Sequence, residues 1–170
     1  MTKLQLPPKA EQQDEQYAFP YHYVPQMDGD RASLNRSLRW GLEYLCYQHH
    51  VMELVSSVSP SSVLDVGCGD GFFLNRISSP DLERLGIDFS PRAIGLANAL
   101  KSDGARFIVG NVTDIVETFD VVLAIEVLEH IPDNQIEKFL KSTYARVAPG
   151  GYLIISVPSK VQTLHPKHYR

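Results

Sequence analysis

Three glycines at alternate positions, Gly67, Gly69 and Gly71, follow a short apolar run that ends in an acidic residue and a valine. The run at 63–66 is typical of a buried parallel strand, and the residues from Phe72 onward are typical of the start of a helix. Glycines between a strand and a helix let the backbone turn sharply and approach a ligand closely. Such a turn also directs backbone N–H groups beyond the strand end. We therefore expect this segment to hold a ligand.

The glycine spacing and the preceding acid indicate the kind of ligand. A dinucleotide-binding turn has the spacing Gly-x-Gly-x-x-Gly, and Phe72 stands where its third glycine would be. Asp65 places a carboxylate at the strand tip, which disfavours a pyrophosphate and favours a cationic group. The segment resembles the first motif of the class I S-adenosylmethionine-dependent methyltransferases, Asp-x-Gly-x-Gly-x-Gly. Their cofactor carries an ammonium and a sulfonium group and no phosphate, so this resemblance and the charge argument agree.

A second acid, Asp88, ends the next apolar run, 23 positions after Asp65 (88 − 65). One strand–helix–strand unit produces an interval of about 20 residues, and an acid at the second strand tip commonly binds ribose hydroxyls. A solvent-exposed turn acid is the alternative. Alone, Asp88 would also suit a nicotinamide enzyme, but together with Asp65 and the glycines it favours an adenosyl ribose.

The segment at 110–114, Gly-Asn-Val-Thr-Asp, follows the third apolar run. The resemblance implies that Asp114 holds the adenine amino group and that Val112 packs against the ring. Asparagine and aspartate also favour turns for local reasons, so a turn role for Asp114 is the alternative. The resemblance implies the following cofactor-binding residues: Asp65, Gly67, Cys68, Gly69, Gly71, Asp88, Phe89, Asn111, Val112, Asp114 and Glu126.

The ionisable residues Glu126, Glu129 and His130 follow the fourth apolar run. Ligands bind at the carboxyl edge of open α/β sheets, so we expect Glu126 close to the methionine moiety and the acceptor. His130 titrates in the physiological range and is the candidate base for a hydroxyl acceptor, with Glu126 or Glu129 orienting it. A purely structural role for His130 is the alternative, because methyl transfer from a sulfonium often needs only aligned, desolvated reactants.

The string Glu-Val-Leu-Glu-His at 126–130 resembles two branches of this superfamily. One is the ubiquinone-biosynthesis type with its small-molecule relatives. The other is the small-RNA 2′-O-methyltransferases, in which two Glu and two His bind a divalent metal. In that second case His165 or His168 would be the fourth ligand, and such a set suits a borderline or hard ion. The acidic chain has no basic stripe for an RNA backbone, so we favour the first branch, without a metal.

Strand and helix patterns alternate from residue 63 onward, and the predicted fold rests on this alternation. Alternation implies a doubly wound, mainly parallel sheet with helices on both faces. Ser90 and Pro91 provide a helix cap and a first-turn proline, and Pro-Gly-Gly at 149–151 turns the chain into the fifth strand. The expected strands are 63–66, 84–88, 106–109, 120–125 and 152–157, and the expected helices lie near 71–78, 91–101 and 133–146.

The remaining segments frame this cofactor-binding domain, which we place at 59–160. Residues 1–32 form a flexible arm that is aromatic at 17–25, and 33–58 form a helix, capped by Ser33, that covers the cleft. A tail occupies 161–170. Members of the superfamily usually add a two-strand hairpin after the fifth strand, and we expect that hairpin to be missing here, which leaves an open sheet edge.

Composition excludes several classes of protein. A length of 170 residues predicts one domain, and 44% hydrophobic with 21% charged residues is ordinary for a soluble globular protein. The net charge of −4 makes nucleic acid an unexpected partner. The two cysteines, Cys46 and Cys68, form no disulfide pattern, and no signal or membrane-spanning segment is evident, so we expect a cytoplasmic location.

The sequence therefore predicts an S-adenosylmethionine-dependent methyltransferase that acts on a small-molecule acceptor. Two other classes stay open beside the RNA enzyme. A nicotinamide-dependent oxidoreductase is disfavoured by the glycine spacing and Asp65, whereas a non-catalytic cofactor-binding scaffold is compatible with the expected loss of the hairpin. The acceptor, the atom methylated and the oligomeric state are not predicted, because no diagnostic motif marks the pocket walls.

Overall fold

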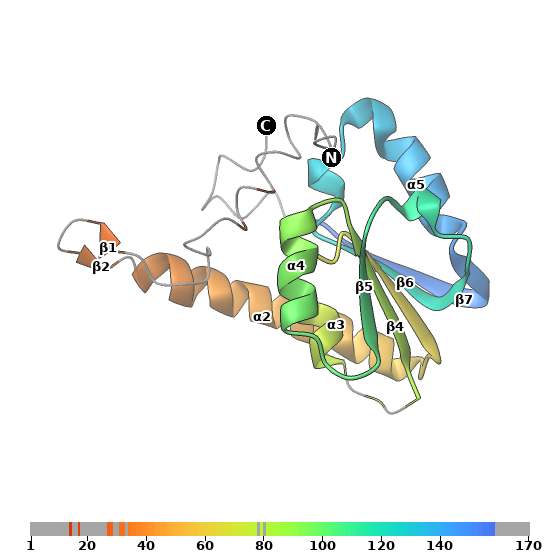
Figure 1. Ribbon diagram of the computed structural model, residues 1–170, viewed down its shortest axis with the longest axis horizontal. Helices are drawn as coiled ribbons and strands as arrows, with labels where there is room; N and C mark the ends of the chain where they lie inside the picture. The colour runs from red at the N-terminus through yellow and green to blue at the C-terminus, as the bar shows by residue number, and fades with distance from the viewer. Residues whose placement is uncertain are drawn as a thin grey trace. The chain divides into compact units, whose positions relative to one another are not determined.

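The computed structural model describes residues 34–77, 79 and 81–158, together with residues 14, 17, 27–28 and 31–32 (Figure 1). It forms two units, Met1–Ser59 and Pro60–Arg170, and each unit is treated by itself. The predicted tail at 161–170, the capping residue Ser33 and most of the aromatic arm lie outside the described residues. In the described part, no helix has both the length and the apolar character needed to cross a bilayer.

The first unit contains one long helix, α2 (Leu34–Ser57), and a two-stranded antiparallel pair. The pair joins β1 (Met27–Asp28) to β2 (Arg31–Ala32), which the sequence patterns did not predict. The helix covers nearly the whole of the predicted range, because apolar residues recur there at helical spacing.

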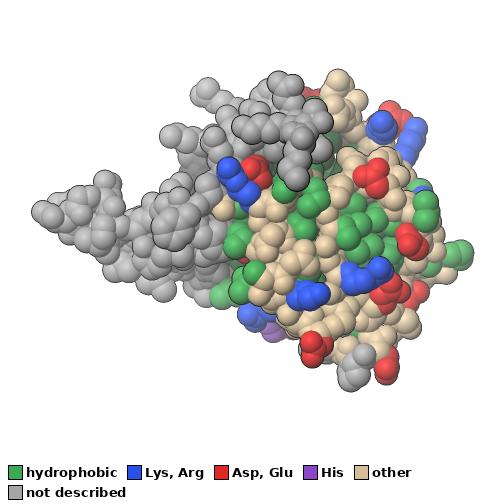
Figure 2. All heavy atoms as spheres, viewed as in Figure 1, with side chains coloured by type: hydrophobic (Ala, Val, Ile, Leu, Met, Phe, Trp, Pro, Cys, Tyr) green, Lys and Arg blue, Asp and Glu red, His purple; other side chains and the backbone are tan. Residues whose placement is uncertain are grey.

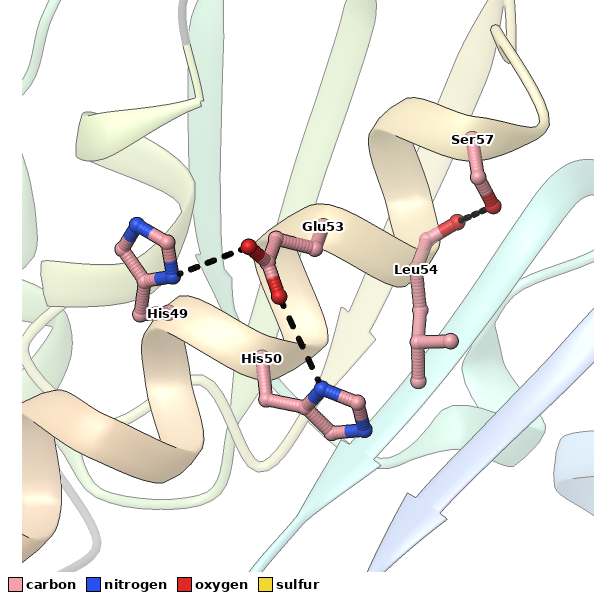
Figure 3. Close-up of polar contacts among 5 residues, drawn as sticks. All are labelled: His49, His50, Glu53, Leu54 and Ser57. Carbon is pink, nitrogen blue, oxygen red and sulfur yellow. Dashed lines mark hydrogen bonds and ion pairs between the residues drawn. The ribbon is translucent and has the colours of Figure 1, made fainter.

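The last turns of α2 are ordered by short-range contacts between side chains and backbone (Figure 3). The carboxylate oxygens of Glu53 lie 3.6 Å from His49 Nδ1 and 3.7 Å from His50 Nδ1. The Ser57 hydroxyl donates to the Leu54 carbonyl at 2.7 Å. That carbonyl is at the helix end, where backbone oxygens lose their helical partners, so the Ser57 hydroxyl satisfies one of these oxygens.

The second unit is built on a five-stranded sheet in which every described pairing is parallel. Its order is β5-β4-β3-β6-β7, which confirms the predicted α/β class. The central strand β3 has one neighbour that follows it directly and one that comes after two further strands, so the winding direction reverses at β3. Its strands are β3 (Ser62–Val66), β4 (Glu83–Asp88), β5 (Ala105–Val109), β6 (Phe119–Ile125) and β7 (Val147–Ser156).

Helices pack on both faces of this sheet. On one face a buried cluster that includes Leu64, Ile87 and Val122 contacts Phe139 of α5 (Ile136–Tyr144). On the other face Phe107 of β5 lies close to Ala97 of α4 (Pro91–Ala99). The short helix α3 (Phe72–Arg76) follows the glycine loop. Because side chains of a strand alternate between faces, neighbouring residues of β4 and β5 serve different layers.

Arg84, on β4, is a buried cation at the edge of the sheet opposite the glycine loop. Its Nη1 donates to the carbonyl oxygens of Leu74 at 3.0 Å and Ile77 at 2.5 Å, and to Ser102 Oγ at 3.0 Å. Its Nη2 donates to the Asp103 carbonyl. Arg84 is only 3% exposed, so this guanidinium ties the end of α3 to the loop before β5.

Two local predictions have different outcomes. Ser90 caps α4 as expected, since its Oγ accepts the Ala93 N–H at 3.1 Å with Pro91 in the first turn. The predicted start of the fifth strand at residue 152 is wrong, because β7 already pairs at Val147, opposite Phe119. Pro149–Gly151 lies inside β7 as an irregularity of the ladder, where Gly150 adopts a φ of +83°. No strand follows β7 within the described residues.

The helix predicted over 133–146 is also shorter than expected. Two 3₁₀ turns, η2 (Leu128–His130) and η3 (Asp133–Gln135), precede α5, which begins at Ile136. Pro132, directly before η3, cannot donate a backbone hydrogen bond. The segment after β6 is therefore a compact series of turns, and η2 carries two of the predicted site residues.

Candidate active site

The glycine loop connects the tip of β3 to α3, and both backbone conformation and close packing require glycine at two of its positions. Gly67 has a φ of +77°, and a Cβ there would lie 2.6 Å from Val127 Cγ2. Gly71 has a φ of +73°, and a Cβ there would lie 2.6 Å from Phe107 Cζ. Both conformations are rare for residues with a side chain. The first contact also brings the segment after β6 directly against the loop.

Four N–H groups of this loop donate to other protein atoms, although we expected the turn to direct its N–H groups beyond the strand end. The N–H groups of Gly67 and Cys68 donate to the Ile87 carbonyl at 2.8 and 3.2 Å. Gly69 N–H donates to Asp88 Oδ2 at 3.0 Å, and Gly71 N–H donates to the Cys68 carbonyl at 3.0 Å. A phosphate site needs such donors for its anion. The loop geometry therefore disfavours a dinucleotide.

Asp65 is a buried carboxyl group at the strand tip, with 2% exposure. Its Oδ1 is buried and receives no hydrogen bond from the described residues. Burial, and then the nearby Asp88 carboxylate, raise the pKa of Asp65 to about 7. A buried carboxylate oxygen without a hydrogen-bond partner is costly, so a cationic group next to Asp65 Oδ1 would be favoured.

Asp88 has a role in the protein itself that the sequence did not predict. Besides Gly69, its carboxylate accepts the Ser90 N–H, through Oδ1 at 2.8 Å. The Asp88 carbonyl accepts the Gly110 N–H at 2.9 Å. Asp88 thus joins the glycine loop, the start of α4 and the loop after β5, and it is 8% exposed. The alternative of a freely solvated turn acid is wrong.

The segment after β5 forms the short 3₁₀ turn η1 (Val112–Asp114), closed by reciprocal side-chain caps. Asn111 Oδ1 accepts the Thr113 N–H at 3.1 Å, and Asp114 Oδ2 accepts the Asn111 N–H at 2.8 Å. Asp114 therefore has the turn role that we gave as the alternative to adenine binding. This role does not exclude Asp114 from the candidate site. Val112 is 4% exposed and belongs to the buried cluster.

Two further predicted positions carry no polar chemistry in their side chains. The Cys68 side chain is buried, and this burial, together with the nearby acids, raises the pKa of its thiol well above the usual value. The thiol is therefore protonated at neutral pH, and Cys68 contributes through its backbone. Phe89 is half-buried between Asp88 and Ser90.

Glu126 lies directly after β6 in an uncommon backbone conformation, with a φ of +54°. Its N–H donates to both the carbonyl and the hydroxyl oxygen of Ser156, each at 3.1 Å. The Ser156 hydroxyl donates to Glu126 Oε1 at 2.9 Å. Ser156, at the end of β7, is a site residue that sequence reasoning missed. A serine at the tip of an apolar strand was the only signal, because Glu126 is 30 residues away.

Glu129 and His130 lie on η2, next to Glu126 in sequence. Burial raises the pKa of Glu129 to about 7, its own backbone N–H opposes this, and the charge of Glu126 adds to it. Burial also raises the pKa of Glu126, and the Ser156 hydroxyl partly offsets that effect. His130 Nε2 lies 3.8 Å from Glu129 Oε1. The structure thus brings Glu126, Glu129 and His130 together, and the first two of these are half-buried carboxyl groups.

Within the described residues, no three His, Cys, Asp or Glu side chains are arranged to hold a metal ion. His165 and His168, the possible fourth ligands of the RNA-enzyme hypothesis, lie outside that part of the chain. The face shown in Figure 2 also mixes acidic and basic side chains rather than gathering the basic ones. No observation on the described residues therefore favours the metal-dependent alternative.

A parallel sheet with a glycine loop at the tip of its central strand defines the class, a Rossmann-like α/β domain that binds a cofactor at the carboxyl edge. A family model described as a methyltransferase domain matches residues 38–169. The chain belongs to this methyltransferase-domain family, as the glycine motif indicated.

Curated relatives agree with this membership. The ubiquinone biosynthesis O-methyltransferase of Rhizobium rhizogenes is 36% identical over 100 residues, which make up 55% of this chain and 40% of that protein. The protein of the same name from Pseudomonas putida is 31% identical over 122 residues, 67% of this chain and 50% of its own length. The chain spans half or less of the length of these two relatives.

Solved structures with the same fold include three methyltransferases. A TehB-like SAM-dependent methyltransferase from Corynebacterium glutamicum has a TM-score of 0.58 at 26% identity, over 72% of this chain and 71% of that one. The plantazolicin methyltransferase BpumL in complex with SAH has a TM-score of 0.52 at 27% identity, over 61% and 42%. Magnesium protoporphyrin IX methyltransferase from Synechocystis has a TM-score of 0.70 at 19% identity, over 94% and 80%, a likeness of fold alone.

Proposed function

We propose that this chain binds S-adenosylmethionine and transfers its methyl group to a small-molecule acceptor. The observation that carries the proposal is Asp65, a buried carboxyl at the central strand tip whose Oδ1 receives no hydrogen bond from the described residues. The cationic methionine end of this cofactor would neutralise it. Family membership and the SAH complex of a related fold support the same cofactor.

The cofactor side of the site would use three acids at successive strand ends. Asp65 would face the cationic end, Asp88 the ribose and Asp114 the adenine. Asp88 and Asp114 are already fixed by backbone N–H groups, so these carboxylates are held in place before a ligand arrives. Such preorganisation lowers the cost of binding.

The bound cofactor supplies an electrophilic methyl group on a sulfonium. The protein must then align the acceptor, exclude water and remove a proton. Glu129, with a pKa of about 7, is suited to accept that proton near neutral pH, and His130 Nε2 lies 3.8 Å from its Oε1. We favour a hydroxyl acceptor, because the curated relatives are named O-methyltransferases. A cytoplasmic location belongs to the same proposal and is supported by the lack of a disulfide pattern in the two cysteines.

Isothermal titration calorimetry with S-adenosylmethionine, S-adenosylhomocysteine and NAD tests the cofactor. We expect saturable binding of the first two and none of NAD. Asp65→Asn and Asp88→Ala should each weaken binding by about tenfold or more, the loss expected for a charge-assisted contact. The matched control is Glu83→Gln, an exposed acid at the other end of β4, which should bind as the wild type does. Binding of NAD alone would contradict the proposal.

Turnover distinguishes an enzyme from a cofactor-binding scaffold. The chain is incubated with radiolabelled S-adenosylmethionine and a panel of small phenols and other hydroxyl compounds, and transfer of label is measured. Glu129→Gln should lower kcat by about 10²-fold or more, as removal of a general base commonly does, and leave the cofactor Kd unchanged. Tight cofactor binding without any transfer would favour the scaffold.

A further inference from the structure

The backbone of Glu126 adopts a conformation that the residue would not choose alone. A φ of +54° belongs to the left-handed region, which side chains other than Gly, Asn and Asp rarely occupy. Such strain persists only where the surroundings hold it, and it concentrates at functional sites. A specific partner must therefore fix Glu126.

Ser156 is that partner, and it contacts both the backbone and the side chain of Glu126. The Glu126 N–H is shared between the Ser156 carbonyl and hydroxyl oxygens, at 3.1 Å each. The hydroxyl has a single hydrogen, which it gives to Glu126 Oε1 at 2.9 Å. One serine thus binds the backbone N–H of Glu126 and one oxygen of its carboxyl group.

A donated O–H favours the ionised form of the carboxyl that accepts it. In the half-buried setting of Glu126, burial acts in the opposite direction and raises the pKa of the carboxyl. The serine therefore acts on the charge of Glu126 as well as on its position. A negative charge held there acts in turn on Glu129, the neighbouring carboxyl.

We propose that Ser156 is a positioning residue of the acceptor side, which holds the backbone N–H and the carboxyl group of Glu126 in place beside Glu129. The catalytic role of Glu126 in this proposal rests on the proposed function. The way in which Ser156 holds Glu126 does not depend on it. The Ser156 contact joins the last strand, β7, to the site, so the tip of β7 is part of the catalytic edge of the sheet.

The charged groups on the elements around this pair come from two segments. Glu129 and His130 belong to the turn segment that follows β6, while Asp65 lies at the tip of β3 and Asp70 in the glycine loop. β7 contributes no charged residue. The Ser156 hydroxyl is thus the group from β7 that favours ionisation of Glu126.

A titration followed by NMR on protein with ¹³C-labelled glutamate tests the proposal without any acceptor. The Glu126 signal is assigned from its loss in Glu126→Gln. Ser156→Ala should move the titration midpoint of Glu126 upward by about one pH unit, the size expected for one charge-assisted hydrogen bond. Ser156→Thr keeps the hydroxyl and should restore the midpoint. If Ser156→Ala does not fold, Ser156→Cys, a weaker donor of similar size, should show the same upward shift.

The matched control is Ser62→Ala, because the Ser62 hydroxyl accepts the Asp120 N–H at 3.0 Å between β3 and β6. It should lower the melting temperature without moving the Glu126 midpoint. An unchanged midpoint in Ser156→Ala would overturn the proposal and leave Ser156 a structural tie. Calorimetry with S-adenosylmethionine on the same samples separates the two hypotheses, since absent binding by wild type counts against the function and not against the Ser156 contact.

Discussion

Asp65 and Asp88 are identical side chains at neighbouring strand tips, yet they differ in what they bind. The carboxylate of Asp88 accepts two backbone N–H groups, whereas Asp65 Oδ1 is buried without such a bond from the described residues. Hydrogen bonds to the charged form offset the cost of burial, and their lack leaves that cost in place. Asp88 therefore stabilises the loops, while Asp65 is available for a cationic ligand at the expense of stability.

The cost of burying the Asp65 carboxylate makes the free energy of unfolding depend on pH, and the direction of that dependence can be predicted. Because the pKa of Asp65 is raised from 3.8 to about 7, the folded protein binds a proton more firmly than the unfolded chain. The free energy of unfolding should then fall as pH rises from 4 to 7, on the order of 3 kcal/mol from this group. Asp65→Asn should remove that part of the decline and be more stable than wild type at pH 8. Urea unfolding at pH 5 and pH 8 measures it.

The comparison between the two proteins isolates Asp65, because Glu129 titrates in the same range in both. Parallel stability curves for wild type and Asp65→Asn from pH 4 to 8 would mean that the Asp65 carboxyl is not perturbed. Weaker S-adenosylmethionine binding in the more stable variant would show that stability is sacrificed for binding at this position.

Substitution by alanine should have opposite effects on stability at two glycines, Gly71 and Gly95. Gly71→Ala places a Cβ 2.6 Å from the Phe107 ring at a φ of +73°, and we expect a loss of about 2–3 kcal/mol in unfolding free energy. Gly95→Ala lies in α4, where a Cβ would meet no atom within 4 Å. Its better helix propensity should add about 0.5–1 kcal/mol. Urea unfolding of both variants tests the pair, and equal effects would contradict the packing argument.

At the scale of elements, Arg84 holds the end of α3 and the loop before β5 through four acceptors. A guanidinium has five N–H donors spread over a planar group, whereas an ammonium has three on a single nitrogen and cannot span the same separated acceptors. Arg84→Lys should therefore cost about 2–4 kcal/mol, since buried carbonyls lose their donors. Arg106→Lys is the control, because Arg106 pairs with Glu83 at 2.8 Å on the exposed surface, and its cost should stay within about 0.5 kcal/mol. Chemical denaturation compares the two.

The elements that sequence predicted well are those with local signals. Three apolar runs that were predicted as strands form β3, β4 and β6, and most of their residues are buried. The helix cap formed by Ser90 and Pro91 is complete within four residues. The contacts that the sequence did not predict join segments that lie far apart along the chain. Val147 pairs with Phe119 despite the Pro-Gly-Gly that follows it, and Ser156 reaches Glu126 across 30 positions. Local pattern carries no information on such pairings.

The same distinction applies to the candidate site. Asp65, Asp88 and the glycines could be predicted because strand ends in a parallel sheet meet at one edge. Their separate roles could not, since these depend on which N–H group each carboxylate accepts. The N–H groups of Gly67 and Cys68, which we expected to point beyond the strand end, instead donate to the Ile87 carbonyl on the adjacent strand β4.

At the scale of the whole molecule, the net charge of −4 and the mixed charges on the visible face (Figure 2) predict weak contact with polyanions. We expect no binding of a short RNA duplex tighter than about 10⁻⁵ M at physiological salt. Fluorescence anisotropy at two salt concentrations measures it. Micromolar binding that weakens steeply with salt would restore the RNA methyltransferase hypothesis.

The central position of β3 also sets an order of events during folding. β3 pairs with β4 after a loop of one short helix, but its other neighbour, β6, is about 58 residues away in sequence. Closing that longer loop costs more chain entropy, so the β3-β4-β5 half can assemble first, with one side of β3 exposed. The chain emerges from the ribosome in the same order. The contact between Val127 and Gly67, which unites the two halves of the site, therefore forms only once β6 has docked, and Ser156 reaches Glu126 only after β7 has paired with β6.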